Sequence, residues 1–277
     1  MNNIAFLEKK AYDLRKKVLD TCIRAKTGHV TSSMSCAEIM SVLYHGGILR
    51  YDPKRPDWAD RDRFILSKGQ ASPMLYAVLA DAGFFDEAQL KAFAQKDGQF
   101  GVHLQQSVPG AEITCGSLGQ GFGFAAGMAL AAKMDLKNHM VFTLLGDGEN
   151  QEGSIWETAM FASHNRLNNL VAILDRNYQC VLDFTENFLS LEPVDKKWEA
   201  FGWNVIRVEG QSVPALLDAL HGLRSRRRPN PTIVIADTTK GAGIDSMSCI
   251  PLWHGAAPAG DAATLAVAEL ERNSPHA

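Results

Sequence analysis

Two short apolar segments, 140–145 and 170–174, constrain the fold of this chain more than any other feature. Each has the length and the largely apolar character of a strand that is buried on both faces of a parallel sheet. The first leads directly into Gly-Asp-Gly at 146–148, and the second leads into Asp-Arg-Asn at 175–177. Polar residues therefore follow two predicted strands at their carboxyl ends, which is the edge where open α/β sheets bind ligands.

Further predicted elements alternate along the chain around these two strands. Strands are expected at 63–67, 140–145, 170–175, 203–208 and 232–236, and helices at 4–26, 35–44, 72–82, 86–95, 117–133, 152–165, 196–201 and 213–222. The segment 99–114 has no periodicity and is predicted to be a long loop. The alternation favours an α/β fold, a doubly wound and mostly parallel sheet with helices on both faces.

Length and composition indicate a single domain. The 277 residues, 46% hydrophobic and 21% charged, contain no repeat and no linker, so 1–277 is expected to form one domain with a short variable tail from about 259. The net charge of −3 argues against a nucleic-acid partner, and no apolar stretch approaches the roughly 20 residues of a membrane span. The five cysteines are scattered without a Cys-x-x-Cys pair, which favours reduced thiols and a cytoplasmic location.

The two polar motifs have the chemistry of a divalent metal site. Asp147 offers a carboxylate and Asn177 offers an amide oxygen, 30 positions apart (177 − 147), a gap that suits one crossover helix. Magnesium takes six oxygens and usually receives few of them from the protein, while phosphates and water supply the rest. Gly148 lets the backbone approach a phosphate, and Gly116-Ser117, expected to open the Gly-rich helix, offers free N–H groups to another phosphate oxygen. The pattern predicts a metal clamped on a diphosphate.

At this spacing, the span 146–177 resembles the thiamine-diphosphate motif, in which Gly-Asp-Gly is followed by Asn. The surrounding sequence resembles the transketolases, because seven separated motifs occur in the order of that family over roughly 10–258. These are Gly28-His29, Leu66-Ser67-Lys68-Gly69, Pro109-Gly110-Ala111-Glu112, Gly116-Ser117-Leu118-Gly119-Gln120-Gly121, Gln151-Glu152-Gly153, Lys240-Gly241 and Trp253-His254-Gly255. The resemblance implies the thiamine-diphosphate-binding fold of the diphosphate-side domain. It also implies thiamine diphosphate and Mg²⁺ as cofactors, with Ca²⁺ or Mn²⁺ as a substitute.

The resemblance also implies roles for individual residues. Asp147 and Asn177 are implied to bind magnesium together with the main-chain carbonyl of Gln179. The implied cofactor contacts are Gln70, Gly116, Ser117, Leu118, Gly148, Glu152, Asn177 and His254. The implied catalytic residues are His29, His103, His254 and Glu152. Glu152 and Glu157 are further implied to lie at a subunit interface between paired cofactors.

The histidines suit the reaction that the resemblance implies. That reaction moves a two-carbon ketol unit from a ketose or ketose phosphate to an aldose or aldose phosphate. Cleavage beside a carbonyl needs proton transfer at hydroxyls and a donor to the developing oxyanion. Imidazole does both near neutral pH, so His29, His103 and His254 are expected to face the reacting end of the substrate.

The sequence departs from the family in two respects. Gln70 stands where the family usually has histidine after Ser-x-Gly. It can donate to a phosphate but cannot carry a proton charge, so we expect a retained diphosphate contact and an altered preference for the donor sugar. Transketolases are also more than twice as long, and nothing after Trp253-His254-Gly255 resembles their pyrimidine-binding domain, which carries the glutamate that activates the cofactor.

The second departure predicts the N-terminal subunit of a split transketolase. Such a chain would be inactive alone. A C-terminal subunit of similar size, carrying the pyrimidine-binding domain, would complete each active site in an α2β2 assembly. Sugar length and stereochemistry are expected to be determined largely by that partner.

Three other interpretations remain open at this point. The alpha subunit of a 2-oxo-acid dehydrogenase also carries Gly-Asp-Gly, but Gly-Ser-Leu-Gly-Gln-Gly at 116–121 and Trp-His-Gly at 253–255 favour transketolase. Deoxyxylulose-phosphate synthase fits less well around His29 and Gly116. A non-catalytic, degenerate subunit is the third interpretation. The intact pair Asp147 and Asn177 and the retained His29, His103 and His254 argue against it.

Overall fold

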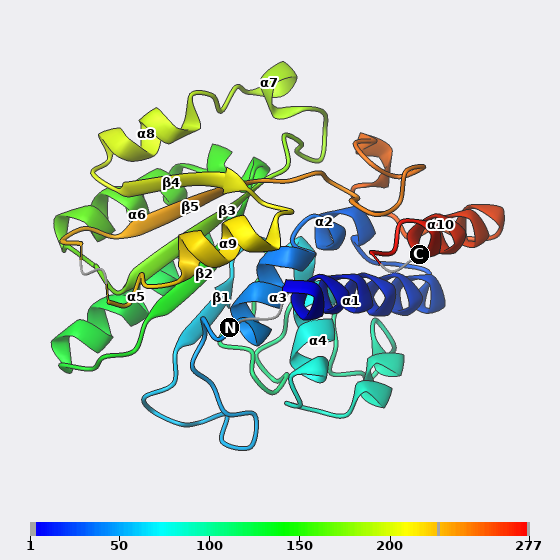
Figure 1. Ribbon diagram of the computed structural model, residues 1–277, viewed down its shortest axis with the longest axis horizontal. Coiled ribbons are helices and arrows are strands. Elements are labelled where there is room, and N and C mark those ends of the chain that lie inside the picture. The colour runs from blue at the N-terminus through cyan, green and yellow to red at the C-terminus, as the bar shows by residue number, and fades with distance from the viewer. Residues whose placement is uncertain (1–3, 226–227, 276–277) are drawn as a thin grey trace.

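Five parallel strands form the centre of the structure, a computed structural model that describes residues 4–225 and 228–275 (Figure 1). They lie in the order β1-β2-β3-β5-β4. Their bounds are β1 Arg63–Leu66, β2 Val141–Gly146, β3 Leu170–Arg176, β4 Asn204–Glu209 and β5 Thr232–Asp237. Every pair of neighbours is parallel, and the register aligns Gly146 with Asp175 at the carboxyl ends of β2 and β3. The predicted parallel sheet is confirmed, and the two polar motifs meet at one edge of it.

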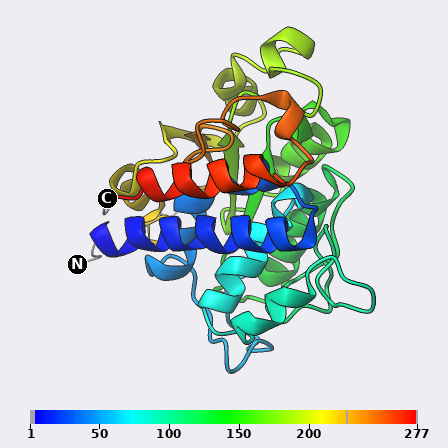
Figure 2. The same cartoon turned by 90° about the vertical axis from the view of Figure 1, so that its right-hand side faces the viewer.

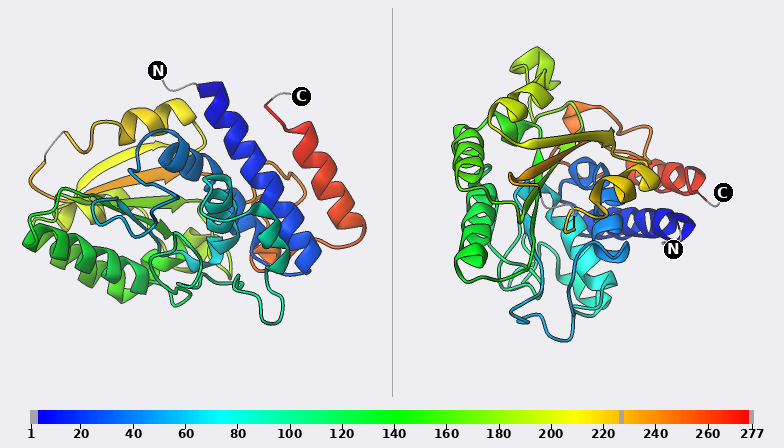
Figure 3. Two further views of the ribbon diagram at one scale, coloured as in Figure 1. Left: turned by 90° about the horizontal axis from the view of Figure 1, so that it is seen from below. Right: turned by 60° about the vertical axis from the view of Figure 1, so that its left-hand side comes forward.

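Helices cover both faces of this sheet (Figure 3). One face carries α1 Ile4–Ala25, α2 Val30–Met34, α3 Ala37–His45, α4 Ser72–Asp81 and α9 Val213–Leu220, and the other carries α5 Gln120–Met134, α6 Gly153–His164 and α8 Val194–Ala200. Strand side chains alternate between the two cores: Phe142 and Leu144 enter the first, and Val141 and Leu145 enter the second. Because β2 and β3 are buried along their whole length, they are largely apolar, which is why apolar segments predicted them.

The C-terminal helix α10, Asp261–Arg272, lies beside α1 (Figure 2). Its Ala266 and Leu270 are buried in the core on the α1 face of the sheet. The carboxylate of Glu269 accepts hydrogen bonds from the N–H and the hydroxyl of Ser246 at 2.9 and 2.8 Å. The tail expected from about 259 therefore contains an ordered helix that packs against the rest of the chain.

The helix predicted at 86–95 is wrong in type and length. The segment Glu87–Ala92 is a 3-10 helix, although Asp86 caps it as predicted by accepting the N–H of Ala88 at 2.9 Å. The chain turns out of the helix at Phe93, whose side chain is buried in the core. Burial of this ring outweighs the few backbone hydrogen bonds that a longer helix would add.

Other boundaries shift by a few residues, and several short elements were not predicted. The helix predicted at 35–44 begins at Ala37 and follows the separate helix α2. The unpredicted short elements are α7 Thr185–Phe188 and the 3-10 helices η1 Gly69–Ala71, η3 Gly148–Gln151 and η4 Pro251–Trp253. The predicted loop at 99–114 is confirmed. None of the described helices combines the length and the apolar character needed to span a membrane.

The Gly-rich helix α5 begins later than predicted. Gly119 has a φ of +80°, outside the helical range, and its N–H donates to Oε1 of Glu149 at 2.9 Å. Gly116-Ser117 therefore belongs to the turn before α5 and does not open the helix. Within the helix, Gly121 packs directly on β1, because a Cβ there would lie 2.7 Å from the Cα of Ser67.

Gly121→Ala is expected to destabilise the chain even though alanine is the better helix former. Overpacking against the backbone of Ser67 costs about 1–3 kcal/mol, and helix propensity returns only about 1 kcal/mol. Gly127→Ala in the same helix is the matched control, since a Cβ there meets no described atom within 4 Å. It should stabilise the chain by about 1 kcal/mol. Urea unfolding measures both variants, and stabilisation by Gly121→Ala would contradict the close approach.

Candidate functional site

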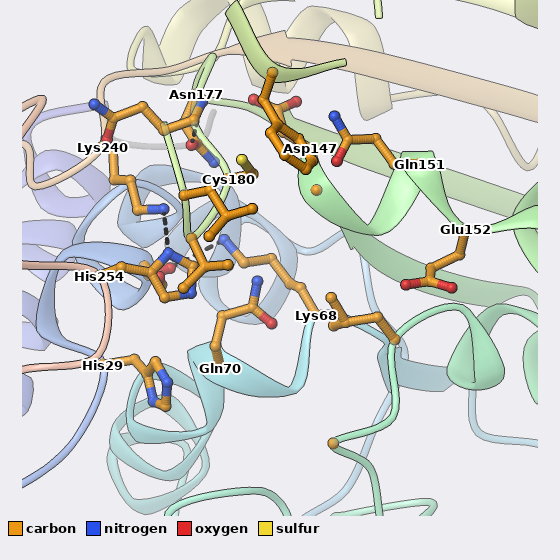
Figure 4. A pocket seen from close by; sticks show the side chains of 18 of the residues that line it. His29, Lys68, Gln70, Asp147, Gln151, Glu152, Asn177, Cys180, Lys240 and His254 are labelled. Atoms are coloured by element: carbon orange, nitrogen blue, oxygen red, sulfur yellow. Dashed lines mark hydrogen bonds between the residues drawn. The ribbon is translucent and has the colours of Figure 1, made fainter. Parts of the chain in front are cut away.

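A cavity of about 300 Å³ opens at the carboxyl edge of the sheet, where the turns after four strands meet (Figure 4). The turn after β1 contributes Lys68 and Gln70, the turn after β2 contributes Asp147, the turn after β3 contributes Asn177, and the segment after β5 contributes Lys240. The volume lies at the lower end of the range for small-molecule sites. The cavity is thus the ligand-binding crevice that a parallel α/β sheet places at its strand ends.

Most predicted site residues converge on this cavity. Its lining includes His29, Gln70, His103, Gly116, Leu118, Asp147, Gly148, Glu152, Asn177, Gln179 and His254. The side chain of Ser117 is exposed and is not among the described residues that line it. Glu157 is exposed on α6, also outside the cavity. The structure therefore brings together the predicted set, with the side chain of Ser117 as the exception.

Asp147 and Asn177 lie at adjacent strand ends with their side chains buried. Oδ2 of Asp147 accepts the N–H of Tyr178 and forms an ion pair with Nη1 of Arg176 at 3.2 Å. Oδ1 of Asp147 is buried and has no hydrogen-bond partner among the described residues. Burial, with a contribution from the charge of Asp175, raises the pKa of Asp147 to about 7, while Arg176 opposes this shift. One carboxylate oxygen is therefore left for a ligand.

The donor set fits a magnesium ion held with a diphosphate. Asp147 supplies one free carboxylate oxygen, and Asn177 supplies an amide oxygen that also accepts the N–H of Gln179 at 3.2 Å. The main-chain carbonyl of Gln179 is the third donor that the sequence predicted. Among the described residues, no group of three or more His, Cys, Asp or Glu could hold a metal. A site with one carboxylate and few other protein ligands suits magnesium, which takes its remaining ligands from phosphates and water.

Further unpartnered polar atoms line the same cavity, as do the glycines Gly116 and Gly148. Within the described residues, Oγ of Ser32, Nδ1 of His29 and both amide atoms of Gln179 are buried without a hydrogen-bond partner. A Cβ on Gly148 would lie 3.1 Å from Cβ of Cys180, so a larger residue would narrow the space there. Buried polar atoms of this kind normally find a partner, which indicates a polar ligand.

Three histidine rings stand together on one side of the cavity. The ring centroid of His29 lies 5.4 Å from that of His103 and 5.7 Å from that of His254. Burial, with the neighbouring His103 and Lys240, lowers the pKa of His29 to about 4. Burial and Lys240 lower the pKa of His254 to about 3. At neutral pH, His29 and His254 are therefore uncharged, and each has one donor and one acceptor nitrogen.

Lys240 determines which nitrogen of His254 carries the proton. Nζ of Lys240 lies 2.8 Å from Nδ1 of His254, as the dashed line in Figure 4 shows. Burial and the charge of Lys68 lower the pKa of Lys240 to about 8, so the ammonium form still predominates at pH 7. An ammonium group can only donate, so Nδ1 accepts and Nε2 carries the hydrogen. His254 can therefore offer an N–H donor at Nε2.

A buried network beneath the cavity fixes the turns that line it. Nζ of Lys68 forms an ion pair with Asp175 and donates to the carbonyl of Ser32 at 3.0 Å. The fully buried carboxylate of Glu149 accepts the N–H groups of Gly119 and Gly146 at 2.9 and 3.0 Å. Glu149 thus ties the Gly-rich turn before α5 to the Gly-Asp-Gly turn after β2.

Sequence reasoning missed several residues that line the cavity. They are Ser32, Lys68, Gln151, Cys180, Val181, Leu182, Phe188 and Lys240. Lys68 and Lys240 each stand beside a glycine in a motif already noted, and that position was the available indication. The apolar residues gave no indication, because an exposed apolar side chain is ordinary in any sequence. Val181, Leu182 and Phe188 are 54–62% exposed and form an apolar rim at the mouth of the cavity.

His254→Asn is expected to flatten the pH dependence of stability on the acid side. The pKa of His254 is about 3 in the fold, and that of an unfolded histidine is about 6.5. Between these values the unfolded chain binds more protons, so the free energy of unfolding falls as the pH drops below about 6.5. Asparagine removes this contribution.

Urea unfolding of the chain from about pH 7.5 to 4.5 measures this effect. The stability of His254→Asn relative to wild type should improve steadily as the pH falls. His164→Asn is the control for loss of an exposed imidazole at the end of α6. Parallel slopes for wild type and His254→Asn would contradict the buried, neutral state of this ring.

Comparison with known proteins places these features in context. Residues 8–271 match the family model described as transketolase, thiamine diphosphate binding domain. An apulose-4-phosphate transketolase subunit of Actinobacillus succinogenes is 38% identical over 267 residues, 96% of each chain. A 6-deoxy-6-sulfo-D-fructose transketolase subunit of a Clostridium species is 36% identical, again over 96% of each chain.

Solved structures show the same relationship. Transketolase from Campylobacter jejuni superimposes with a TM-score of 0.89 at 31% sequence identity. The superposition covers 99% of this chain and 43% of the Campylobacter jejuni chain. The present chain therefore spans less than half the length of that transketolase but nearly the full length of the two relatives named as subunits.

Proposed function

This chain belongs to the transketolase family, and from that membership we propose that it is the N-terminal subunit of a split transketolase. In this proposal, residues 1–277 form one domain that binds the diphosphate side of thiamine diphosphate with Mg²⁺. A separate C-terminal subunit carries the pyrimidine-binding domain. Together they transfer a two-carbon ketol unit from a ketose or ketose phosphate to an aldose or aldose phosphate.

The pairing of Asp147 with Asn177 at adjacent strand ends carries this proposal. Oδ1 of Asp147 lacks a partner within the described chain, and the cavity beside it also contains Gln70, Gly148 and Lys240. A cation bound to Oδ1 of Asp147 and to the amide oxygen of Asn177 would neutralise the buried carboxylate and hold the diphosphate. The amide of Gln70 and the ammonium of Lys240 would donate to phosphate oxygens.

The histidines serve the reacting end of the substrate in this proposal. Thiamine diphosphate, when bound, supplies the electron sink for cleavage of the carbon–carbon bond. His254, with its hydrogen fixed at Nε2 by Lys240, donates to an oxygen that gains negative charge. The uncharged ring of His29, together with His103, exchanges protons with substrate hydroxyls. Glu152 lies across the cavity from His29, on the side proposed to meet another subunit (Figure 4).

An exposed apolar border supports the need for a partner chain. Val181, Leu182 and Phe188 line the cavity yet are 60%, 62% and 54% exposed, and Leu252 beside His254 is 84% exposed. Apolar side chains grouped at the mouth of a polar cavity are typical of a surface that another protein covers. We propose that the pyrimidine-binding subunit covers this border and closes the active site.

A second apolar surface supports pairing of two copies of this chain. On α5 and α6, Phe124, Met160 and Phe161 are 55%, 59% and 44% exposed, and Glu157 lies on the same face of the molecule. In the proposed α2β2 assembly this surface joins the two copies, with Glu152 and Glu157 near the contact.

The five cysteines are free thiols, and a cytoplasmic location stays a prediction from their scattered positions.

Turnover is expected only when both subunits are present. The chain alone should give no detectable ketol transfer with thiamine diphosphate and Mg²⁺, and addition of the candidate pyrimidine-domain chain should restore it. The relatives are named for a sugar phosphate and for a sulfo-sugar, so anionic ketoses are the first donors to assay. Full activity of the isolated chain would contradict the split site.

Binding experiments on the same mixture separate this proposal from a degenerate, non-catalytic subunit. Thiamine diphosphate should bind to the assembled chains when Mg²⁺ is present. Binding should be lost when EDTA removes the Mg²⁺. Asp147→Ala should abolish the Mg²⁺-dependent binding of the cofactor, because it removes the single carboxylate of the site. Absence of cofactor binding under every condition would favour the degenerate subunit.

Gln70→His is expected to change the donor preference while the cofactor still binds. The side-chain amide of Gln70 forms no hydrogen bond with the described residues, and its Nε2 would lie 3.4 Å from a Cβ on Gly146, beside the proposed diphosphate. Histidine there could carry a positive charge near a phosphate and thereby alter ligand discrimination. The relative kcat/KM for a panel of ketose donors measures the effect. Unchanged cofactor affinity together with an unchanged donor profile would refute this role for Gln70.

A further inference from the structure

A second cavity, of about 520 Å³, lies at the amino-terminal edge of the sheet. The segments 138–140, directly before β2, and 168–169, directly before β3, contribute to its lining. The six residues of β2 separate it from the turn that contains Asp147, a length of about 20 Å. Its volume falls within the range of small-molecule sites. The proposed reaction gives this cavity no role.

Four basic side chains line this cavity, and none of the described residues that line it is acidic. Arg50 precedes β1, and Arg224 lies between α9 and β5. Lys133 and Lys137 lie at the C-terminal end of α5. A concave surface lined by charges of one sign focuses their field and attracts ions of the opposite sign. The lining therefore favours an anion.

Two carboxylates beside the cavity neutralise only part of this charge. Asp62, whose side chain is fully buried, forms an ion pair with Arg224 and accepts the backbone N–H of Arg50 at 2.8 Å. Asp60 forms an ion pair with Lys137 at 3.0 Å. Four cations and two carboxylates leave a surplus of two positive charges, which matches the charge of a phosphate monoester at neutral pH.

Several donors of these cations remain available to a ligand. Nζ of Lys133 donates to the carbonyls of Asn165 and Arg166 at 2.9 and 3.0 Å, and it has no carboxylate partner in the described part of the chain. An ammonium group has three hydrogens, so one is left. The side-chain contacts of Arg50 with other described residues all use Nη2, which leaves Nε and Nη1. Guanidinium nitrogens in this arrangement suit two oxygens of one phosphate.

Two residues of the lining also carry buried polar atoms that no described residue contacts. His139 is only 8% exposed, and its Nδ1 is buried without a hydrogen-bond partner. Oδ1 of Asn169 is in the same situation, although Nδ2 donates to the carbonyl of Ala129 at 2.9 Å. Burial and the charge of Arg63 lower the pKa of His139, so the ring is neutral at pH 7. Buried polar atoms normally find a partner, which indicates a ligand with polar groups.

We propose that this cavity is a second ligand site, which binds a small phosphate monoester. The surplus positive charge attracts the dianion, Nε and Nη1 of Arg50 bind two phosphate oxygens, and the ammonium of Lys133 binds a third. His139 and Asn169 hydrogen-bond to the organic part of the ligand. The net charge of −3 on the whole chain favours a small anion over a nucleic acid.

An NMR titration of the full chain at pH 7.5 tests this site, with inorganic phosphate, glycerol 3-phosphate and adenosine monophosphate as probes. The ring resonances of His139 and the side-chain amide resonances of Asn169 report on this cavity alone, so a phosphate bound at the carboxyl edge of the sheet does not interfere. Each probe should shift these resonances along a saturable curve. Sodium chloride at the same ionic strength should not, because screening alone does not saturate a site.

Lys133→Gln and Arg50→Gln should each raise the half-saturating concentration of the probes by about tenfold, the scale of one charge-assisted hydrogen bond. Lys196→Gln on α8 is the matched control, since it removes one exposed ammonium at a distance from the cavity and should keep the wild-type value. Lys133→Gln loses two contacts to the end of α6. If circular dichroism shows that this variant does not fold, Arg50→Gln decides.

The three probes also distinguish the source of the phosphate. Equal affinities would support a site that recognises the phosphate group alone, and tighter binding of adenosine monophosphate would support a site for nucleotides. Wild-type affinity in the folded variants, or the absence of a saturable shift with all three probes, would overturn the proposal.

Discussion

One buried carboxylate, Asp175, connects the elements from which the site is built. Its oxygens accept the ammonium of Lys68 after β1, the hydroxyl of Ser35 before α3 at 2.7 Å, and the hydroxyl of Thr238 after β5. Burial alone would lower the pKa of Lys68, but the charge of Asp175 outweighs it, and the pKa lies above its usual value. Neither charge could remain at this depth without the other, because an unpaired buried ion is strongly destabilising. The pair therefore holds the turns after three strands in one arrangement, and the cavity lies directly above them.

The sheet and the edge at which the cavity lies could be predicted because their determinants are local. Largely apolar segments indicate strands buried on both faces, and the residue that follows such a strand must lie at the carboxyl edge. Asp147 and Asn177 were found in this way, and the structure places them together with His29, His103 and His254. Their roles toward a cofactor stay predictions, whereas their convergence on one cavity is observed.

The supporting contacts could not be predicted, because they join residues that are far apart in the chain. Lys68 and Asp175 are separated by 107 positions, and neither a period nor a spacing links them. Contacts between distant residues also explain where the secondary-structure prediction was wrong. Phe93 ends a predicted helix because its ring enters the core, and Gly119 delays α5 because its N–H is used by Glu149. In both cases a tertiary contact overrides local propensity, which a single sequence does not reveal.

This chain supports some parts of the cavity fully and leaves others uncovered. Around Asp147, the charge partner and the backbone donor both come from the same chain, so intramolecular contacts alone position this carboxylate. At the mouth of the cavity, Val181 and Leu182 leave apolar surface in contact with water, which is unfavourable until another surface covers it. The position of the Asp147 carboxylate is thus determined by this chain, whereas cover over the mouth of the cavity depends on an additional surface. In a two-chain enzyme of this kind, the affinity for the metal–diphosphate unit and the rate of turnover would respond to changes in different subunits.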